Sequence, residues 1–423
     1  MNTMKETKHL EFKEKITNTF LKTVSAYANY DGGTIIFGIN DNGTIVGLSD
    51  ITKQSLAIEN KINDSIKPQP LYSITENNKD NTISLIVHPG TSKPYLYNSK
   101  AYKRNDTSTI EVDNIELKRL ILEGNNMSFE ELPSDQQDLS FTVLEHKLKE
   151  KRGISQFNID ILKTLNLYSD TSGYNNAAAI LADNNKFPGI DIAVFGETIS
   201  IIKKRETLDN KSIIQAYEEA ISIFKDYYSF EVIDSANREK VETIPETAFR
   251  EATANAIIHR LWDVKSQIRV SMFNDYVEII SPGGLPTGIS KDEYVDGRVS
   301  ILRNPIIANV FNRLNYVETF GTGIRRIKEA YINSSIKPTF DISDNTIKVV
   351  LPILAYGLNL TPDETIVYNI LNKIKAKPIS EIMASPTLTF GKSKVTELLK
   401  SMASKNIVVI EGKGKGTKYR IYN

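Results

Sequence analysis

The side chains best suited to chemistry lie in the segment 249–260. Glu251, Asn255 and His259 follow one another at intervals of four residues, so a helix would place all three in one row on the same face. The positions between them are mostly alanine and isoleucine, and a polar row is costly to bury in such surroundings unless it meets a partner. The row therefore marks a candidate ligand site. The alternative is that Asn255 and His259 only cap or bridge neighbouring segments.

Two glycine-containing segments follow this predicted helix. Their candidate ligand-contacting residues are Ser281, Gly283, Gly284, Gly321, Thr322 and Gly323. Gly321 and Gly323 precede a helical pattern, and the free N–H groups and dipole of a helix N-terminus suit a phosphate. We therefore predict that the second segment contacts phosphate. The alternative is that all of these glycines only occupy turns.

The composition narrows the chemistry that is open to this chain. Its 423 residues include no cysteine, which excludes disulfides, thiolate metal sites, iron–sulfur clusters and a cysteine nucleophile. No apolar run is long enough to span a bilayer, and the first residues are charged where a secretory signal would be apolar. We therefore expect a cytoplasmic protein with no membrane partner. We expect no helicase motor, because the sequence GKS at 391–393 has proline at 386 where the first glycine of a P-loop belongs.

The overall charge balance conceals an uneven distribution. The chain has 52 basic and 52 acidic side chains. Residues 1–125 are neutral, residues 126–360 have a net charge of −6, and residues 361–423 have a net charge of +6. A basic module of this size is expected to meet polyanions. The last segment therefore predicts DNA as a partner.

Changes in local composition and in apolar pattern indicate the domain boundaries. Residues 126–140 are acidic and contain proline, which is typical of a linker. A second boundary lies near 352–362, where a strand-like pattern ends and a helical one begins. We therefore predict an α+β multidomain fold with domains at 1–125, 141–355 and 361–423.

The apolar pattern of residues 1–125 predicts an α/β unit. Helical spacing covers 14–29, and the run 34–39 predicts a buried strand that turns into a second strand over 44–48. A further helix is expected at about 51–66. Further strands are expected near 70–75, 82–88 and 101–105.

Several short motifs in this unit occur in a fixed order. They are Glu6, Glu11-Phe12-Lys13, the segment 26–33 (AYANYDGG), Gly38-Ile39-Asn40-Asp41 and the segment 102–109 (YKRNDTST). Their order resembles that of the Schlafen AlbA-type domain. The resemblance implies that this unit binds nucleic acid, either DNA or RNA including tRNA.

The same resemblance suggests a metal site. Relatives that cut tRNA or rRNA use three carboxylates, and the matching positions are Glu6, Glu11 and Asp41. Carboxylate oxygens hold Mg²⁺ or Mn²⁺, and the metal polarises phosphate and activates water. The alternative is that Glu6 and Glu11 are solvated and that Asp41 caps a turn. Lys103 and Arg104 are candidate phosphate contacts, or else exposed surface charges.

The polar row and the glycine segments, together with Arg303-Asn304-Pro305, resemble the nucleotide site of the gyrase, histidine-kinase and MutL-type (GHKL) ATPases. The resemblance is closer to a divergent branch of these ATPases that occurs C-terminal to Schlafen AlbA-type domains. It implies that residues 141–355 form an α/β sandwich that binds ATP with Mg²⁺. Asn255 would hold the metal, and Glu251 would be the general base of a weak ATPase. Ser281 stands where those enzymes have the aspartate that binds adenine, and a hydroxyl does not reproduce a charged acceptor.

Residues 361–423 show three helical patterns followed by two strands. The helices are expected from Thr361 to about 374, at 379–384 and at 392–404, and a glycine- and lysine-rich loop joins the strands. This order is the pattern of a winged helix-turn-helix, whose third helix enters the major groove. The candidate DNA-binding lysines are Lys392, Lys394, Lys413, Lys415 and Lys418. The alternative is a winged helix that serves protein contact or dimerisation.

These features support three hypotheses for the whole chain. The first is a nucleotide-responsive DNA-binding transcriptional regulator, which we expect to be a homodimer. The second is a metal-dependent endonuclease of tRNA or DNA that is gated by nucleotide. The third is an interaction scaffold in which none of these sites works.

Overall fold

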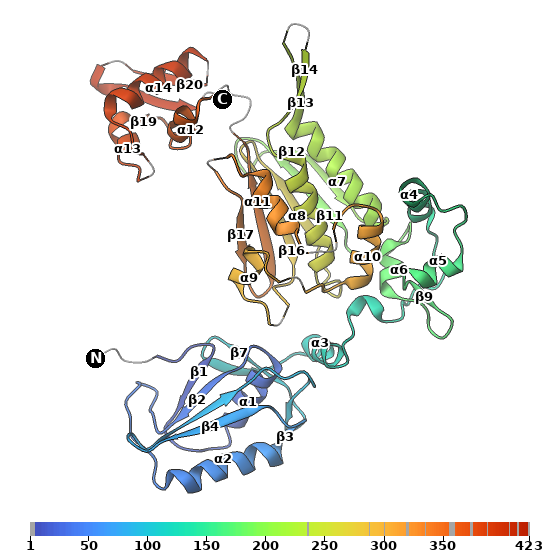
Figure 1. The fold of residues 1–423 in the computed structure, drawn as a ribbon, viewed down its shortest axis with the longest axis vertical. Coiled ribbons are helices and arrows are strands. Elements are labelled where there is room, and N and C mark those ends of the chain that lie inside the picture. Colours follow the sequence, from blue (N-terminus) through green and yellow to red (C-terminus); the bar gives the residue numbers. More distant parts are fainter. Residues whose placement is uncertain are drawn as a thin grey trace. The chain divides into compact units, whose positions relative to one another are not determined.

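The computed structural model confirms the α+β multidomain class, with several separate sheets (Figure 1). It describes residues 5–234, 237–286, 288–299, 301–318, 321–334, 336–354, 360–372, 375–386, 388–405, 407–412 and 414–421, without the side chains of 232–240 and 415. The chain divides into two units, one of Met1–Leu132 with Pro286–Ile289 and one of Pro133–Leu285 with Ser290–Asn423. No helix within the described ranges is long and apolar enough to cross a membrane.

The first unit is built on a four-stranded sheet in the order β1-β2-β5-β4. Its strands are β1 (Leu10–Lys13), β2 (Gly33–Phe37), β4 (Tyr72–Asn77) and β5 (Thr82–Val87). β1 runs parallel to β2, and the other neighbours are antiparallel. The helix α1 (Phe20–Asn29) connects the two parallel strands. Its apolar side chains share one core with the sheet and with α2 (Ile51–Ser65).

Smaller elements complete this unit. They are β3 (Ile66–Lys67) paired with β6 (Leu96–Tyr97), β7 (Tyr102–Asn105) paired with β8 (Ser108–Glu111), α3 (Asn114–Gly124) and the 3-10 turn η1 (Phe129–Glu131). β7 packs against α1, which brings two distant parts of the sequence together. α1 begins at Phe20 and not at residue 14, because a turn in which the hydroxyls of Thr17 and Thr19 hydrogen-bond each other precedes it.

The predicted strand over 44–48 is not formed. Only Ile45 makes an isolated bridge, with Ile39. The side-chain oxygen of Asn40 accepts a hydrogen bond from the backbone N–H of Thr44 at 2.9 Å. This side-chain bond offers the backbone a local alternative to a strand ladder, so the segment closes a turn instead.

The second unit contains a six-stranded sheet in the order β12-β11-β15-β16-β18-β17. Its strands are β11 (Ile190–Phe195), β12 (Ile202–Leu208), β15 (Ile268–Met272), β16 (Tyr276–Pro282), β17 (Thr339–Ile342) and β18 (Thr346–Pro352). β11 and β15 are parallel, and the other neighbours are antiparallel. The helices α7 (Ile213–Tyr228), α8 (Glu246–His259) and α11 (Gly323–Ala330) lie over one face of this sheet (Figure 1).

The remaining elements of this region are short. They are α4 (Thr142–Arg152), α5 (Ile159–Thr164), β9 (Tyr168–Ser169), β10 (Gly173–Tyr174), α6 (Asn176–Leu181), β13 (Ser229–Asp234), β14 (Asn237–Glu242), α9 (Lys291–Val295) and α10 (Pro305–Arg313). α4 is not predicted from the sequence. Asp183 fixes its start by accepting hydrogen bonds from the backbone N–H groups of Thr142 and Val143 at 2.8 and 2.9 Å. This carboxylate comes from another segment, so no local signal marks the start of the helix.

The end of the chain forms a small domain with its own core. Its elements are α12 (Pro362–Tyr368), β19 (Lys377–Pro378), α13 (Ile379–Met383), α14 (Lys392–Ser404), β20 (Val408–Glu411), the 3-10 turn η2 (Gly414–Gly416) and β21 (Lys418–Ile421). The strands form a sheet in the order β19-β21-β20. α12 ends at Tyr368, well before residue 374, and residues 373–374 lie outside the described residues. The helices and the hairpin otherwise follow the predicted order, with β19 in addition.

Candidate functional sites

The polar face of α8 lies against the first turn of α11. A side chain at position 323 would place its Cβ atom 2.7 Å from Nδ2 of Asn255 and 3.1 Å from Oε2 of Glu251. Glycine, which has no Cβ, allows the two helices to approach this closely without moving the Asn255 side chain. The structure therefore places Glu251 and Asn255 against Gly323 at the first turn of α11.

Two polar side chains fix the C-terminal end of α8. Nη1 of Arg303 donates to the carbonyl oxygen of His259 at 2.6 Å. Nδ2 of Asn304 donates to the carbonyl oxygens of Ile258 at 2.7 Å and Arg260 at 2.9 Å. The last carbonyls of a helix have no partner within it, so these bonds hold the end of α8 in place.

Arg326 on α11 forms an ion pair with the candidate general base. Its Nη1 lies 3.1 Å from Oε1 of Glu251, and it also pairs with Glu318. The Glu251 side chain is 6 % exposed. Burial raises its pKa, while the hydrogen bond and the charge of Arg326 oppose that rise. The Arg326 guanidinium therefore compensates the negative charge of the candidate base.

The other two members of the row behave differently. Asn255 is half-buried, and within the described ranges its side-chain amide has no hydrogen-bond partner. Burial, with a contribution from the charge of Arg303, lowers the pKa of His259 to about 4. The imidazole is therefore neutral at physiological pH. Asn255 is the member of the row that is free to take a ligand.

Ser281, at the candidate adenine-binding position, is already used by the fold. Its hydroxyl donates to the carbonyl oxygen of Ala256 on α8 at 2.8 Å, and its side chain is buried. A serine hydroxyl has one proton to donate. The position therefore retains only a neutral acceptor, where the resemblance would require a carboxylate.

The glycines that follow Ser281 are required by packing. A Cβ at Gly284 would lie 2.5 Å from the carbonyl oxygen of Asp344. Gly283 has a φ of +106°, and its Cβ would lie 2.9 Å from Nη1 of Arg303. Both positions exclude other residues without any ligand, so their sequence assignment to a nucleotide loop gains no support from the geometry.

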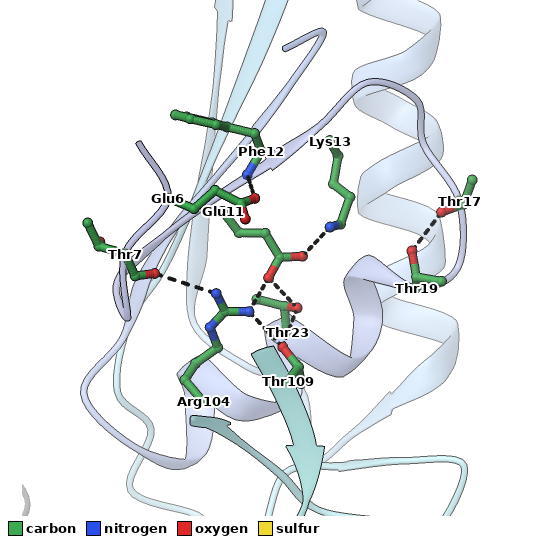
Figure 2. Close-up of polar contacts among 10 residues, drawn as sticks. All are labelled: Glu6, Thr7, Glu11, Phe12, Lys13, Thr17, Thr19, Thr23, Arg104 and Thr109. Carbon is green, nitrogen blue, oxygen red and sulfur yellow. Dashed lines mark hydrogen bonds and ion pairs between the residues drawn. The ribbon is translucent and has the colours of Figure 1, made fainter. Parts of the chain in front are cut away.

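Glu11 of β1 lies at the centre of a buried polar cluster in the first unit (Figure 2). Its carboxylate forms an ion pair with Nζ of Lys13 at 2.7 Å and accepts a hydrogen bond from the hydroxyl of Thr23 at 2.9 Å. It also forms an ion pair with Arg104, and these two side chains are 5 % and 4 % exposed. Nη1 of Arg104 donates further to the hydroxyl of Thr109 at 2.8 Å. Both oxygens of Glu11 are therefore engaged by protein groups.

Among the described residues, Glu6 and Asp41 do not complete a metal site with Glu11. Glu6 accepts a hydrogen bond from the backbone N–H of Phe12 at 2.8 Å (Figure 2). Asp41 is exposed in the turn after β2. In the part of the chain that the structure describes, no three His, Asp or Glu side chains are gathered closely enough to hold a metal ion. The predicted trio is not assembled in this structure.

The two cations assigned to phosphate contact in this unit already have carboxylate partners. Arg104 is buried on Glu11, as described above. Lys103 lies with its Nζ 2.5 Å from the carboxylate of Glu116, which also accepts a hydrogen bond from the hydroxyl of Tyr30 at 2.7 Å. A phosphate would have to displace these carboxylates, so the geometry does not favour the sequence assignment.

The lysines of the last domain are more accessible. Lys392, Lys394 and Lys418 are exposed. Nζ of Lys394 lies 3.2 Å from Asp363, but the two side chains are 49 % and 43 % exposed, and such surface pairs add little stability. Lys392 and Lys418 have no acidic partner among the described residues. Lys413 and the side chain of Lys415 lie outside the described residues.

A buried carboxylate that the sequence analysis did not assign to a site joins two helices of this domain. Glu364 on α12 accepts hydrogen bonds from the hydroxyl of Ser401 at 2.6 Å and from Nζ of Lys405 at 2.8 Å. Burial disfavours its charge, but the bonds from Lys405, Ser401 and the backbone N–H of Thr361 outweigh burial and lower its pKa to about 2. The capping-box spacing of Thr361 and Glu364 was the available signal.

Arg326 was also missed as a site residue. It is the third residue after Gly323, and residues three apart on a helix lie on the same side. That spacing could have placed it next to the polar row, since Gly323 itself faces Asn255.

Comparison with protein families gives two matches. Residues 6–113 match the family "Schlafen, AlbA_2". Residues 265–351 match the family "Putative ATP-dependent DNA helicase recG C-terminal". The second match includes the glycine segments but begins after α8, so Glu251 and Asn255 lie outside it.

Comparison with whole proteins adds little to this. No curated protein matches the chain. The crystal structure of the DIP2311 protein from Corynebacterium diphtheriae is similar to it, with 18 % sequence identity and a TM-score of 0.48 over 98 % of this chain and 92 % of that chain. The chain thus contains a Schlafen AlbA_2 domain and a segment of the recG C-terminal type, and these two matches indicate a nucleic-acid-related function.

Proposed function

We propose that this protein is a regulator that binds duplex DNA through α14. The observation that supports this most directly is the division of α14 into two faces. Its buried side chains are Val395, Leu398, Leu399 and Met402. Its exposed side chains include Lys392, Lys394 and Lys400.

The charge of this domain suits a polyanion. Residues 361–423 contain 11 basic and 5 acidic side chains. Cations that replace the counterions of DNA phosphates supply much of the binding free energy, and the major groove is wide enough to admit an α-helix. Glu397 is the single acid of α14, and a carboxylate at a base edge accepts a hydrogen bond from a cytosine amino group.

In this proposal the Schlafen AlbA_2 domain binds nucleic acid without cutting it. A metal on Glu11 would have to displace Arg104 and Lys13 from a buried carboxylate. Removing one member of a buried ion pair typically costs about 3–5 kcal/mol. A metal-dependent nuclease is the alternative, and Asp41→Asn tests it cleanly because Asp41 is exposed and lies outside the Glu11 cluster.

Nucleotide binding by the middle domain is a second candidate function. It is favoured by the meeting of Asn255 with the first turn of α11. An amide oxygen is a ligand that Mg²⁺ accepts, and the N–H groups at the start of α11 suit a phosphate. These residues fit the phosphate end of a nucleotide, but Ser281 does not fit a charged contact with adenine. We therefore propose a nucleotide site without strong selectivity for adenine, in which Glu251 becomes a base only when Arg326 leaves it.

The test of DNA binding uses the full chain and fluorescently labelled duplex DNA. Anisotropy titrations between about 50 and about 200 mM salt give the slope of log K against log salt concentration. The double variant Lys392→Gln with Lys400→Gln removes two exposed charges, so it should weaken binding and lower that slope by about 2. Lys203→Gln, at an exposed position on β12, is the matched control. A slope that the double variant leaves unchanged would reject α14 as the DNA-contacting helix.

Two further assays separate the other hypotheses. Cleavage of tRNA or DNA in the presence of Mn²⁺ that Asp41→Asn abolishes would favour the nuclease. Saturable binding of labelled ATP and GTP with similar affinity, lost in Asn255→Ala, is expected for the nucleotide site. If neither nucleotide binds, the middle domain is a scaffold.

A further inference from the structure

An open cavity of about 670 Å³ lies beside α11 in the second unit. Charged side chains make up most of its lining. They are Arg325, Arg326, Lys328, Lys337, Glu318 and Glu329. Four of them are cations and two are anions, so the cavity has an excess of positive charge.

Two of these cations are held in place by the fold. Arg326 is paired with Glu318 and with Glu251, as described above. Nζ of Lys337 donates to the carbonyl oxygens of Tyr331 at 2.7 Å and Ile332 at 2.9 Å, just beyond the end of α11. A lysine has three N–H donors, so these neutral partners leave its charge uncompensated.

The other two cations, Arg325 and Lys328, are exposed. Neither has an acidic partner among the described residues. They are three residues apart on one helix, so their side chains lie next to each other. Glu329 is the remaining acid of the lining, and it cannot offset three uncompensated cations.

A hydroxyl at the wall of the cavity also lacks a partner. Thr322 lines the cavity, and its Oγ1 atom is buried without a hydrogen-bond partner among the residues that the structure describes. Most buried side-chain polar atoms are hydrogen-bonded. An unsatisfied hydroxyl beside a group of cations therefore indicates that an anionic acceptor belongs there.

We propose that this cavity binds phosphoryl groups. A guanidinium matches two phosphate oxygens at once, and an ammonium adds a point charge, while the Thr322 hydroxyl can donate to a third oxygen. The phosphoryl group comes either from a free phosphate compound or from the backbone of a nucleic acid. The cavity shares Thr322 and Arg326 at the start of α11 with the nucleotide site proposed above, but it includes neither α14 nor Asn255. Its own cations are Arg325, Lys328 and Lys337, so it is tested separately through them.

Occupancy of this cavity has a consequence for the neighbouring helix. Arg326 lines the cavity and also holds Glu251 on α8. A bound phosphoryl group competes with both carboxylates for this guanidinium. Binding therefore loosens the ion pair between α8 and α11.

The experiment uses the full chain with two probes. Calorimetric titration with pyrophosphate measures a free phosphoryl ligand, and anisotropy of labelled duplex DNA at several salt concentrations measures the nucleic-acid backbone. Arg325→Gln with Lys328→Gln removes the two free charges. Because both lost groups are charged donors to the ligand, pyrophosphate should bind at least about tenfold more weakly. Arg325→Lys with Lys328→Arg should retain binding, and Lys203→Gln should have no effect.

The outcomes separate the two sources and the proposal itself. Weakened pyrophosphate binding alone assigns the cavity to a free phosphate compound. A DNA salt slope that falls by about 2 in the same variant assigns it to a nucleic-acid backbone. If neither pyrophosphate affinity nor the DNA slope changes, the proposal is overturned. Lys392→Gln with Lys400→Gln should leave pyrophosphate binding intact, so failure of the α14 hypothesis would be recognised separately.

Discussion

Arg104→Met should destabilise the first unit strongly, because it leaves Glu11 buried without its main counter-charge. Removing one member of a buried ion pair typically costs about 3–5 kcal/mol. Lys13 remains 2.7 Å from Glu11 and is itself 27 % exposed, so part of the compensation survives. We therefore expect a loss near the lower end of that range, about 3 kcal/mol.

Glu11→Met should cost a similar amount for the opposite reason, because it leaves Arg104 buried and unpaired. Combining the two substitutions replaces both charges with apolar side chains, a change that is often neutral or stabilising. Thr23 and Thr109 can still hydrogen-bond each other, since their hydroxyl oxygens are 2.9 Å apart. The double variant should therefore be more stable than either single variant, which corresponds to a coupling free energy of at least about 3 kcal/mol.

Hydrogen exchange of the full chain measures these costs locally. Peptides covering β1 and β2 report the opening free energy of the first unit. Trp262 is the only tryptophan of the chain and is buried in the second unit, so its fluorescence during urea unfolding should be the same in all variants. Single-variant costs that simply add in the double variant would refute the idea that Glu11 and Arg104 stabilise each other.

Two further predictions concern the second unit. The pKa of Glu364 is lowered from 4.5 to about 2. At pH values above 4.5 the charged carboxylate therefore stabilises the last domain by about 3 kcal/mol. This stabilisation is lost as the pH falls from about 5 to about 2. The stability difference between Glu364→Gln and the natural chain, measured by exchange of α12 and α14 peptides, should shrink over that range, and a constant difference would contradict the linkage. Gly284→Ala should destabilise the middle domain by about 1–3 kcal/mol, because its Cβ meets the backbone oxygens of Asp344 and Ser343 at 2.5 and 2.7 Å. Gly323→Ala should cost less, because the Asn255 amide that its Cβ meets can turn away. Trp262 fluorescence during urea unfolding measures the stability of both glycine variants. Equal costs in the two variants would argue against packing as the cause of the destabilisation.

Features with a local periodic signal could be predicted from the sequence. The intervals between Glu251, Asn255 and His259 place them on α8 as expected, and the apolar positions of α14 define its buried face. Both depend only on the 3.6-residue period of a helix. The boundary of α1 and the turn at 44–48 could not be predicted, because side-chain hydrogen bonds of Thr17 and Asn40 compete there with regular structure.

The partners of the charged residues could not be predicted at all. Glu251 and Arg326 are 75 residues apart in the sequence, and Glu11 and Arg104 are 93 residues apart. No spacing rule connects such positions. The roles of the glycines could not be told apart from the sequence either, because Gly284 and Gly323 both occur in short glycine-containing segments. In the structure Gly284 packs on the backbone of Ser343 and Asp344, whereas Gly323 packs on Asn255 and Glu251 of α8.

These ion pairs change what the number of basic residues means for nucleic-acid binding. Five cations of the first unit form ion pairs with glutamates. They are Lys13, Lys93, Lys100, Lys103 and Arg104. Among the described residues of the second unit, Arg325, Lys328, Lys392 and Lys400 have no acidic partner. A polyanion gains from counterion release when it meets a cation that is free, whereas a paired cation must first lose its carboxylate. Phosphate contact is therefore expected on α11 and α14 and not on β7, even though residues 1–125 contain 15 basic side chains and residues 361–423 only 11.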